Sequence, residues 1–521
     1  MDKTLTELKK EIMKNPTAIS NEAIALINTI VSGWESLLPS ARESIFSFVS
    51  ELADGTSAAN GLFLYSWLLA LENKPQYLIK LQDIGMRSET LSIETRYFWL
   101  RQCDVKIFKS PQIATKETKI NQWKWLRKLT NEYAEILENE YGRSLRKIPY
   151  SERNSSYVIV LASQILSKLH SPTMITLDRC KTMIERCNKT VLLINVADGI
   201  TQVGSTQIWG KFIESYVEEY TEVDRLEWEG CSIPFFQCNP DMPNRDVIDY
   251  LLGFIAQRPP AFVVSIGGGD LFTGLVNRLV PVLTVGMSAS IPGDDTDYVS
   301  IPGELSDEDK AVVNALHIDE NKILRSLFTY SIQKKCGEYK RKNYGLYEDD
   351  QVLAVVGNRL NEELTDEFWK VMEQIQDPFT KIFLIGEYSD ECLKDLELRY
   401  PLLAGRVING GYANDLRGVL KICDLFVNPR RSGGGTSAVI SLDAGVPVIT
   451  LRYGDVYYVA GDDFAAEAIE DYPEIIEQYR NDLAYVKSQK EKALKRASIL
   501  QDTEGEFCKL IASLEIHISG E

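Results

Sequence analysis

The sequence predicts an α/β protein in which two Rossmann-like domains face a cleft and follow an all-helical N-terminal domain. Its 521 residues are too many for a single hydrophobic core. Apolar residues recur at helical spacing to about residue 150, and beyond it short apolar runs alternate with amphipathic segments in two successive series. We therefore expect an all-helical domain over 1–150, a first Rossmann-like domain over 151–345, and a second over 346–521 that ends in a helical tail.

The N-terminal region carries the pattern of packed amphipathic helices. No repeat of fixed period is present, which argues against a solenoid. Five of the eight tryptophans lie here, and buried core positions are a more common role for them than a peptide-binding surface. Apolar residues recur at spacings of three and four in Ile24–Val31, Ile45–Leu52, Leu62–Leu71, Tyr97–Cys103 and Trp123–Leu137.

The first α/β series has continuous apolar runs that are typical of parallel strands buried on both faces. Alternation of strands with helices predicts a doubly wound sheet. A charged stretch over 304–345 is expected to be helical and to connect the two α/β domains. The predicted strands are Tyr157–Ala162, Val191–Val196, Phe262–Ile266 and Val282–Val285, and the predicted helices are 174–187, 204–219, 244–256 and 270–279.

The second series repeats this pattern and is followed by a helical tail at about 465–516. In open α/β sheets, ligands bind beyond the carboxyl ends of the strands, so the loops at those ends hold the candidate site residues. The predicted strands are Val352–Val356, Ile382–Ile385, Arg406–Ile408, Leu425–Val427 and Val446–Leu451, with one of the helices at Asn414–Ile422.

Composition limits the partners. The formal net charge of −18 argues against nucleic acid or an anionic membrane as the main partner. No segment has the length and apolarity of a membrane span, and Met1 begins a charged stretch that is unlike a signal peptide. The nine cysteines are scattered without zinc-site spacing, as expected for reduced thiols in a cytoplasmic protein.

A glycine-rich loop follows the predicted strand Leu425–Val427. Gly433, Gly434 and Gly435 allow close approach of the backbone to a ligand, and the following helix presents free N–H groups. This combination predicts a diphosphate cradle. Because no Gly-Lys-Ser/Thr follows the glycines, the loop differs from a kinase-type P-loop. The competing interpretation is a tight turn before a capped helix.

Side chains around this loop add hydroxyl groups and charge. Thr436 and Ser437 can donate hydrogen bonds to phosphate oxygens, and Arg431 can add positive charge. Arg359, in the turn after Val352–Val356, should open on the same cleft and is a candidate to neutralise a diphosphate leaving group. A surface arginine is the alternative for Arg359.

Three residues of the first Rossmann-like domain are candidate bases. His170 lies in the loop after Tyr157–Ala162, just before Pro172 at a helix start. A histidine facing the cleft can act as a general base or bind an acceptor, and a purely structural loop histidine is the alternative. Asp198 and Asp270 follow other strands of this domain and are secondary candidates. The carboxylates of 294–297 are expected to lie in a solvated turn.

Two segments resemble those of GT-B glycosyltransferases in the O-GlcNAc transferase and bacterial adhesin glucosyltransferase family. The first is Gly434-Gly435-Thr436-Ser437 followed by Gly445-Val446-Pro447-Val448. The second is Arg278-Leu279-Val280-Pro281-Val282 followed by Gly286 and Asp297-Tyr298. The bacterial members also carry a helical N-terminal domain. The resemblance covers roughly 151–500 and implies a UDP-hexose donor held by the second Rossmann-like domain.

The resemblance also implies residue roles. Thr436 and Ser437 would contact the diphosphate, and Arg359 takes the approximate place of the family's phosphate-binding lysine. His170 resembles its functional histidine, while Asn409 and Gly410 fall where the base is read by backbone groups. Ile440 stands where the family has the acidic residue that holds the ribose. Asp443 lies one turn away.

The sequence therefore predicts a metal-independent glycosyltransferase that needs no cofactor and moves a glucose- or N-acetylglucosamine-type hexose from a UDP-sugar to a protein or glycan acceptor. Because Ile440 replaces the acidic residue, the alternative is a non-catalytic GT-B partner or chaperone subunit of a glycosylation system. A sugar-nucleotide epimerase is a third interpretation, which would need Asp198 and Asp270 as paired acid and base.

Overall fold

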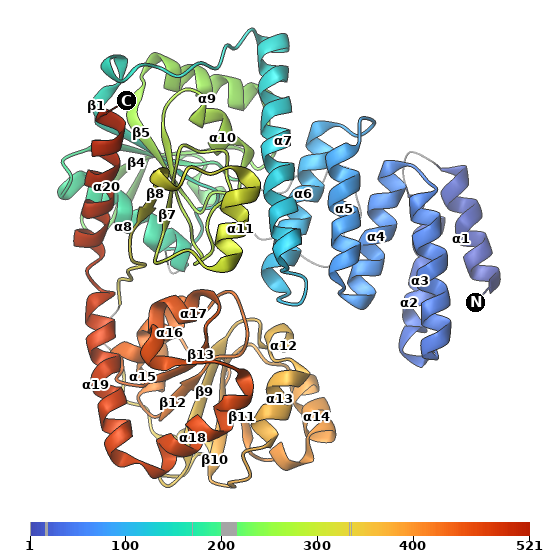
Figure 1. The fold of residues 1–521 in the computed structure, drawn as a ribbon, viewed down its shortest axis with the longest axis vertical. Helices are drawn as coiled ribbons and strands as arrows, with labels where there is room; N and C mark the ends of the chain where they lie inside the picture. The colour runs from blue at the N-terminus through green and yellow to red at the C-terminus, as the bar shows by residue number, and fades with distance from the viewer. Residues whose placement is uncertain are drawn as a thin grey trace.

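The computed structural model describes residues 2–15, 19–168, 170–198, 216–332, 334 and 336–520, and it has the predicted three-part architecture. An array of helices leads to an eight-stranded sheet, and a six-stranded sheet follows (Figure 1). Over these residues no helix is both long and apolar enough to cross a membrane. All nine cysteines are free thiols.

In the described part of the N-terminal region the chain forms seven α-helices. Six of their starts follow local rules. Ser20, Ser57, Ser92 and Thr115 accept a hydrogen bond from the first turn of α2, α4, α6 and α7, and Pro39 and Pro75 stand at the favourable first position of α3 and α5. The helices are α1 (Asp2–Lys14), α2 (Asn21–Ser32), α3 (Pro39–Asp54), α4 (Ala58–Glu72), α5 (Pro75–Arg87), α6 (Ile93–Lys109) and α7 (Lys116–Tyr141).

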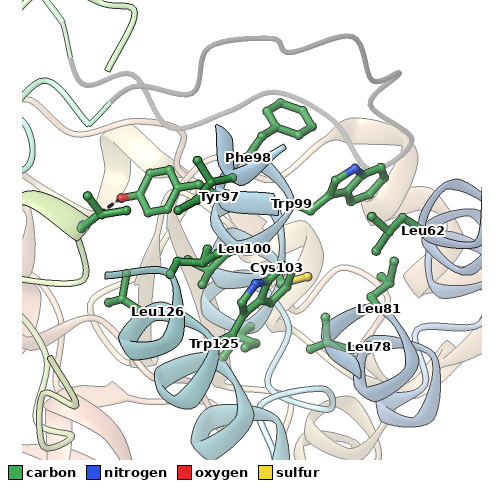
Figure 2. Close-up of a cluster of buried hydrophobic side chains, with 14 of the residues drawn as sticks. Leu62, Leu78, Leu81, Tyr97, Phe98, Trp99, Leu100, Cys103, Trp125 and Leu126 are labelled. Atoms are coloured by element: carbon green, nitrogen blue, oxygen red, sulfur yellow. Dashed lines mark hydrogen bonds between the residues drawn. The ribbon is translucent and has the colours of Figure 1, made fainter. Parts of the chain in front are cut away.

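The tryptophans of this region mostly belong to its core. Trp125 is fully buried on α7 and lies near Leu78 and Leu81 of α5 (Figure 2). A Cβ on Gly85 would overlap the Trp125 indole, so α5 and α7 pack closely because position 85 has no side chain. Trp123 differs, because it is only partly buried.

The first Rossmann-like domain has the sheet order β3-β4-β2-β1-β5-β6-β7-β8. All pairs are parallel except β3 with β4, and the predicted apolar runs form its centre. The strands are β1 (Asn154–Ala162), β2 (Thr190–Asn195), β3 (Arg225–Trp228), β4 (Cys231–Gln237), β5 (Pro260–Ile266), β6 (Val282–Val285), β7 (Tyr298–Ile301) and β8 (Ile323–Arg325). The helices are α8 (Ser171–Glu185), α9 (Arg245–Gln257), α10 (Leu271–Asn277) and α11 (Asp307–Leu316).

Two expectations for this domain need correction, and a third cannot be compared. The β3–β4 hairpin was not predicted, because its residues alternate in burial at the sheet edge and form no continuous apolar run. The stretch 304–345 is not mainly helical: after α11 it contains β8, two short 3₁₀ turns and irregular chain. The helix predicted over 204–219 lies largely outside the described residues, since only 216–219 are described.

The second Rossmann-like domain has a parallel sheet in the order β11-β10-β9-β12-β13-β14. Its strands are β9 (Gln351–Gly357), β10 (Thr380–Gly386), β11 (Val407–Asn409), β12 (Leu425–Val427), β13 (Val448–Leu451) and β14 (Ala465–Ala466). Its helices are α12 (Leu360–Glu363), α13 (Asp366–Glu373), α14 (Asp390–Arg399), α15 (Leu416–Leu420), α16 (Gly435–Asp443), α17 (Gly454–Ala460), α18 (Tyr472–Asn481) and α19 (Leu483–Ile499).

The last helix, α20 (Thr503–Ser519), returns to the first Rossmann-like domain (Figure 1). Phe507, Leu510 and Leu514 join the core formed by β1, β2 and β5. Arg179 of α8 holds the two chain segments that run between the Rossmann-like domains. Its guanidinium donates to the carbonyl of Thr503 at 3.0 Å and to the hydroxyl of Thr329 at 2.8 Å. The prediction that placed the whole tail with 346–521 is therefore wrong for α20: an amphipathic pattern shows that one face is buried, but not against which domain.

Candidate active site

The glycine-rich loop lies where the sequence predicted it, between β12 and α16. Gly434 precedes α16 with φ +101°, and a Cβ there would lie 2.7 Å from Nη2 of Arg431, so the loop needs glycine at this position. Thr436 and Ser437 lie half-buried in the first turn of α16. Their hydroxyls make no hydrogen bond with other described residues, which leaves them and the helix N-terminus available to an anion.

A cluster of arginine side chains lies next to this loop. Arg431 is 3% exposed, and it donates to Glu363 at 2.9 Å, to the carbonyl of Val356 at 2.7 Å and to Asn428 at 2.8 Å. Its Nη2 atom has no hydrogen-bond partner among the described residues. The two N–H groups of this buried nitrogen, next to Gly434, are therefore left for a ligand.

Arg359 completes the cluster. It pairs with the other oxygen of Glu363 at 2.8 Å, and its Nη2 lies 3.4 Å from the position of a Cβ on Gly433. The ring of Phe108 on α6 lies 4.5 Å from the Arg359 guanidinium carbon. Two guanidinium groups share one carboxylate, so a positive charge remains beside the loop. The structure thus brings Arg359, Arg431 and the Gly433–Ser437 loop together.

The candidate base-reading residues lie at the end of β11. Asn409 donates its side-chain amide to the carbonyl of Tyr388 at 2.8 Å, and the Gly410 N–H donates to the carbonyl of Leu384 at 2.8 Å. A Cβ on Gly410 would overlap the ring of Phe383. The Gly410 N–H is therefore used within the sheet and is not available to a ligand.

The position predicted to hold the ribose has no free carboxylate among the described residues of α16. Ile440 on α16 is partly buried and packs against the core of the second Rossmann-like domain. Asp443, one turn further, accepts from Arg417 at 2.6 Å, from Gln501 at 2.8 Å and from Lys334 at 2.5 Å. These donors oppose the effect of burial and lower the pKa of Asp443. Asp443 is thus a structural ion-pair centre.

His170 immediately precedes α8, and burial lowers its pKa. Its Nδ1 lies 3.3 Å from the hydroxyl of Thr173, which in turn accepts from the Leu166 N–H at 2.9 Å. The imidazole is therefore held at the carboxyl end of β1, on the edge that carries the other loops. Among the described residues, no hydrogen bond or ion pair joins His170 to the glycine-rich loop.

The two aspartates proposed as secondary bases are both engaged. Asp198 accepts from the hydroxyl of Tyr97 at 2.7 Å and pairs with Arg101 at 3.1 Å, both on α6. Burial raises the pKa of Asp198 to about 7 although Arg101 opposes the shift. Asp270 caps α10 and accepts from both the N–H and the hydroxyl of Thr273 at 2.7 Å. Both carboxylates therefore have structural partners.

The burial of Asp294 contradicts another expectation from the sequence. It was predicted to lie in a solvated turn, but it is 1% exposed. One oxygen accepts from the Gly269 N–H at 2.6 Å, and the other has no partner among the described residues. Burial raises the pKa of Asp294 to about 7. The turn is buried because Arg127 of α7 donates to the carbonyls of Gly293 and Asp294 and so holds it against the helical region.

A cavity of about 370 Å³ lies where the three parts of the molecule meet. Helices α6 and α7, the 286–292 loop of the first Rossmann-like domain, and 452–458 of the second line it. Ser432, at the start of the glycine-rich loop, also lines it, so the cavity adjoins the predicted phosphate site. Pockets of this size between domains are common ligand sites.

Asp455 lies in this cavity, at the start of α17, and the sequence reasoning missed it. Its Oδ1 accepts from the Ala289 N–H of the opposite domain at 2.7 Å. Burial raises the pKa of Asp455 to about 7, although the hydrogen bond from Ala289 and the charges of Arg431 and Arg359 oppose the shift. Its position in the sequence could have identified Asp455 as a candidate, because Gly454-Asp455 follows strand β13 at the same sheet edge as the glycine-rich loop.

Comparisons with known proteins agree with this architecture. Residues 338–498 match the family model described as "Glycosyl transferases group 1". The chain is similar in structure to a mutant O-GlcNAc transferase of Thermobaculum terrenum, with TM-score 0.53, 11% identity, and coverage of 99% of this chain and 97% of that one. No curated protein sequence matches the chain.

Two further solved structures have lower scores. A glycosyltransferase of Rickettsia africae has TM-score 0.49 and 12% identity, with coverage of 70% of this chain and 99% of that one. Anabaena HepE in complex with UDP has TM-score 0.49 and 12% identity, with coverage of 69% and 100%. The second Rossmann-like domain therefore contains the segment that matches the group 1 glycosyltransferase model, and the whole chain has the fold of the Thermobaculum terrenum O-GlcNAc transferase, two Rossmann-like domains of the GT-B type after a helical region.

Proposed function

We propose that this enzyme moves a glucose- or N-acetylglucosamine-type hexose from a UDP-sugar to a protein or glycan acceptor. One observation carries the proposal: the open N-terminus of α16, with the free hydroxyls of Thr436 and Ser437, lies beside two arginines that share one carboxylate. Such a site suits a diphosphate. The choice of uridine and of a hexose follows from the resemblance of the loop segment to the O-GlcNAc transferase family.

In this proposal the protein stabilises the departing UDP. The acceptor oxygen or nitrogen attacks the anomeric carbon of the sugar, and the bond from that carbon to the phosphate oxygen breaks. The negative charge that develops on the diphosphate is stabilised by the hydroxyls of Thr436 and Ser437 and by the helix N–H groups. The net positive charge of the Arg359–Glu363–Arg431 cluster stabilises it further. Asn409 and Gly410 lie at the sheet edge where the base would bind.

The hydroxyl pair offers a direct test of the donor site. Thr436→Ala combined with Ser437→Ala is expected to weaken UDP binding by about 1–3 kcal/mol, because charge-assisted hydrogen bonds to the diphosphate are lost. Isothermal titration with UDP measures this, with GDP and ADP as specificity controls. Ser498→Ala, an exposed hydroxyl on α19, is the matched control. Equal UDP affinity of the double variant and the parent protein would rule out this phosphate site.

Metal independence has its own test. Because arginines and the α16 N-terminus supply the charge that a divalent cation supplies elsewhere, UDP affinity and sugar transfer are expected to be the same in excess EDTA and in Mg²⁺. Titrations and initial rates in both buffers measure this. A tenfold or larger loss in EDTA would show that the cluster does not replace a metal.

A second candidate function rests on the ribose position. Ile440 packs into the core and Asp443 is held by Arg417, Lys334 and Gln501, so the described residues of α16 offer the ribose no free carboxylate. This favours a non-catalytic GT-B partner or chaperone of a glycosylation system as the alternative. The same titration separates the two, because absence of binding to UDP, GDP and ADP favours the partner.

A further inference from the structure

The cavity beside the glycine-rich loop has a composition that suits a sugar. Four aromatic residues line it: Phe108, Trp123, Tyr453 and Tyr458. Aromatic faces pack against the apolar C–H faces of sugar rings, while a few polar groups fix orientation. The rings come from all three parts of the molecule, since Phe108 lies on α6, Trp123 on α7 and the two tyrosines in the second Rossmann-like domain.

Most charged groups around the cavity are already paired. Lys119 bonds to Glu308 at 3.0 Å, Asp309 accepts from the Ile291 N–H at 2.9 Å, and Asp104 bonds to Arg101 at 3.0 Å. Arg452 bonds to Glu467 at 3.0 Å. The lining contains four carboxylates and two cations, so an anionic ligand is disfavoured.

Asp455 is the exception among these charges. Its backbone N–H donates to the carbonyl of Ser432 at 2.8 Å, which fixes it against the glycine-rich loop. Its Oδ1 is bonded to Ala289, but its Oδ2 makes no hydrogen bond with any described residue. The Asp455 Cβ lies 3.3 Å from the position of a Cβ on Gly435. One carboxylate oxygen is thus free where the donor loop and the cavity meet.

We propose that this cavity is the acceptor site, that the acceptor is a neutral carbohydrate, and that Asp455 receives the proton of its attacking hydroxyl. This inference rests on the proposed function. The hydroxyl oxygen forms a bond to the anomeric carbon, the bond from that carbon to the phosphate oxygen breaks, and UDP leaves with the electron pair. The hydroxyl proton passes to Asp455 Oδ2. The raised pKa of Asp455, about 7, suits a base that works near neutral pH.

Acceptor binding is tested first, without a donor. Saturation-transfer NMR uses a panel of neutral p-nitrophenyl mono- and disaccharides, with uronic acids and an unglycosylated Ser/Thr peptide library as the other arms. Neutral glycosides are expected to bind, and Phe108→Ala is expected to weaken binding at least fivefold. Tyr347→Ala removes an aromatic ring that is 74% exposed and does not line the cavity, so it is the control. Binding of only uronic acids or peptides, or of no arm, would overturn the neutral-carbohydrate assignment.

Transfer to a bound glycoside then tests Asp455. Asp455→Asn keeps an oxygen for the Ala289 N–H, and it is expected to lower kcat about 10²–10⁴-fold with little change in KM. The parent kcat/KM should rise with pH to a plateau above about 7, and the variant should lose this rise. Asp463→Asn, an exposed aspartate paired with Lys492, is the control. If Asp455→Asn retains a tenth of kcat, or if His170→Ala alone removes the pH dependence, Asp455 is not the base.

The donor site and the acceptor site can be refuted independently. Titration with UDP reports on the donor loop and does not involve the acceptor, whereas the NMR experiment involves no nucleotide. UDP binding without glycoside binding would refute the acceptor site and leave the donor proposal standing. Glycoside binding that Phe108→Ala does not weaken would place the acceptor outside this cavity.

Discussion

Replacing Arg101 by Ala is expected to lower the free energy of unfolding by about 3–5 kcal/mol, because it removes one partner of a buried ion pair. The Arg101 side chain is 16% exposed and the Asp198 side chain 3%. Arg101 also donates to the carbonyl of Gly269 at 3.0 Å. The substitution would leave Asp198 with only the Tyr97 hydroxyl, and it would remove a link between α6 and the first Rossmann-like domain.

Urea denaturation of the parent protein and the variant measures this change. Arg87→Ala is the control, because Arg87 lies on the neighbouring helix α5 with its side chain 80% exposed, 3.8 Å from Asp83. That control should leave stability nearly unchanged. A loss below about 1 kcal/mol for Arg101→Ala would show that Asp198 is not held by this pair, and it would return Asp198 to the list of candidate bases.

Asp294→Asn is expected to change how stability depends on pH. The folded pKa of Asp294 is about 7, whereas an unfolded aspartate titrates near 3.9 (a typical value). Between those values the folded protein holds a proton that the unfolded chain has released. The contribution of Asp294 is therefore fully favourable below about pH 4, and it falls by about 1.4 kcal/mol per pH unit until pH reaches about 7. Asparagine has no such proton.

The variant should therefore gain stability relative to the parent protein from pH 5 to pH 7, and the difference should level off above it. Denaturation of both proteins at pH 5, 6, 7 and 8 measures the change. Asp295→Asn is the neighbouring control, because that side chain is 39% exposed beside Arg278. Parallel stability curves for Asp294→Asn and the parent protein would show that Asp294 is not buried with one oxygen unpartnered.

Much of the architecture could be predicted because parallel strands buried on both faces read as continuous apolar runs. Strands such as β1 and β9 were located to within a few residues for this reason. The loop from Gly433 to Ser437 could also be predicted, because consecutive glycines followed by hydroxyl residues favour a tight loop that leads into the start of a helix. Both predictions depend only on residues that are neighbours in the sequence.

The sequence by itself thus determined the order of helices and strands, the doubly wound sheets and the glycine-rich loop before α16, all of which depend on local spacing. Only the tertiary structure decided what each buried group contacts. It placed α20 on the first Rossmann-like domain, buried Asp294 beneath α7, joined Arg359 and Arg431 through Glu363, and set Asp455 against Ala289 of the opposite domain. A pattern of apolar and polar residues records that a side chain is buried or capping. The identity of its partner depends on chain segments that are distant in sequence, and it emerges only when they pack together.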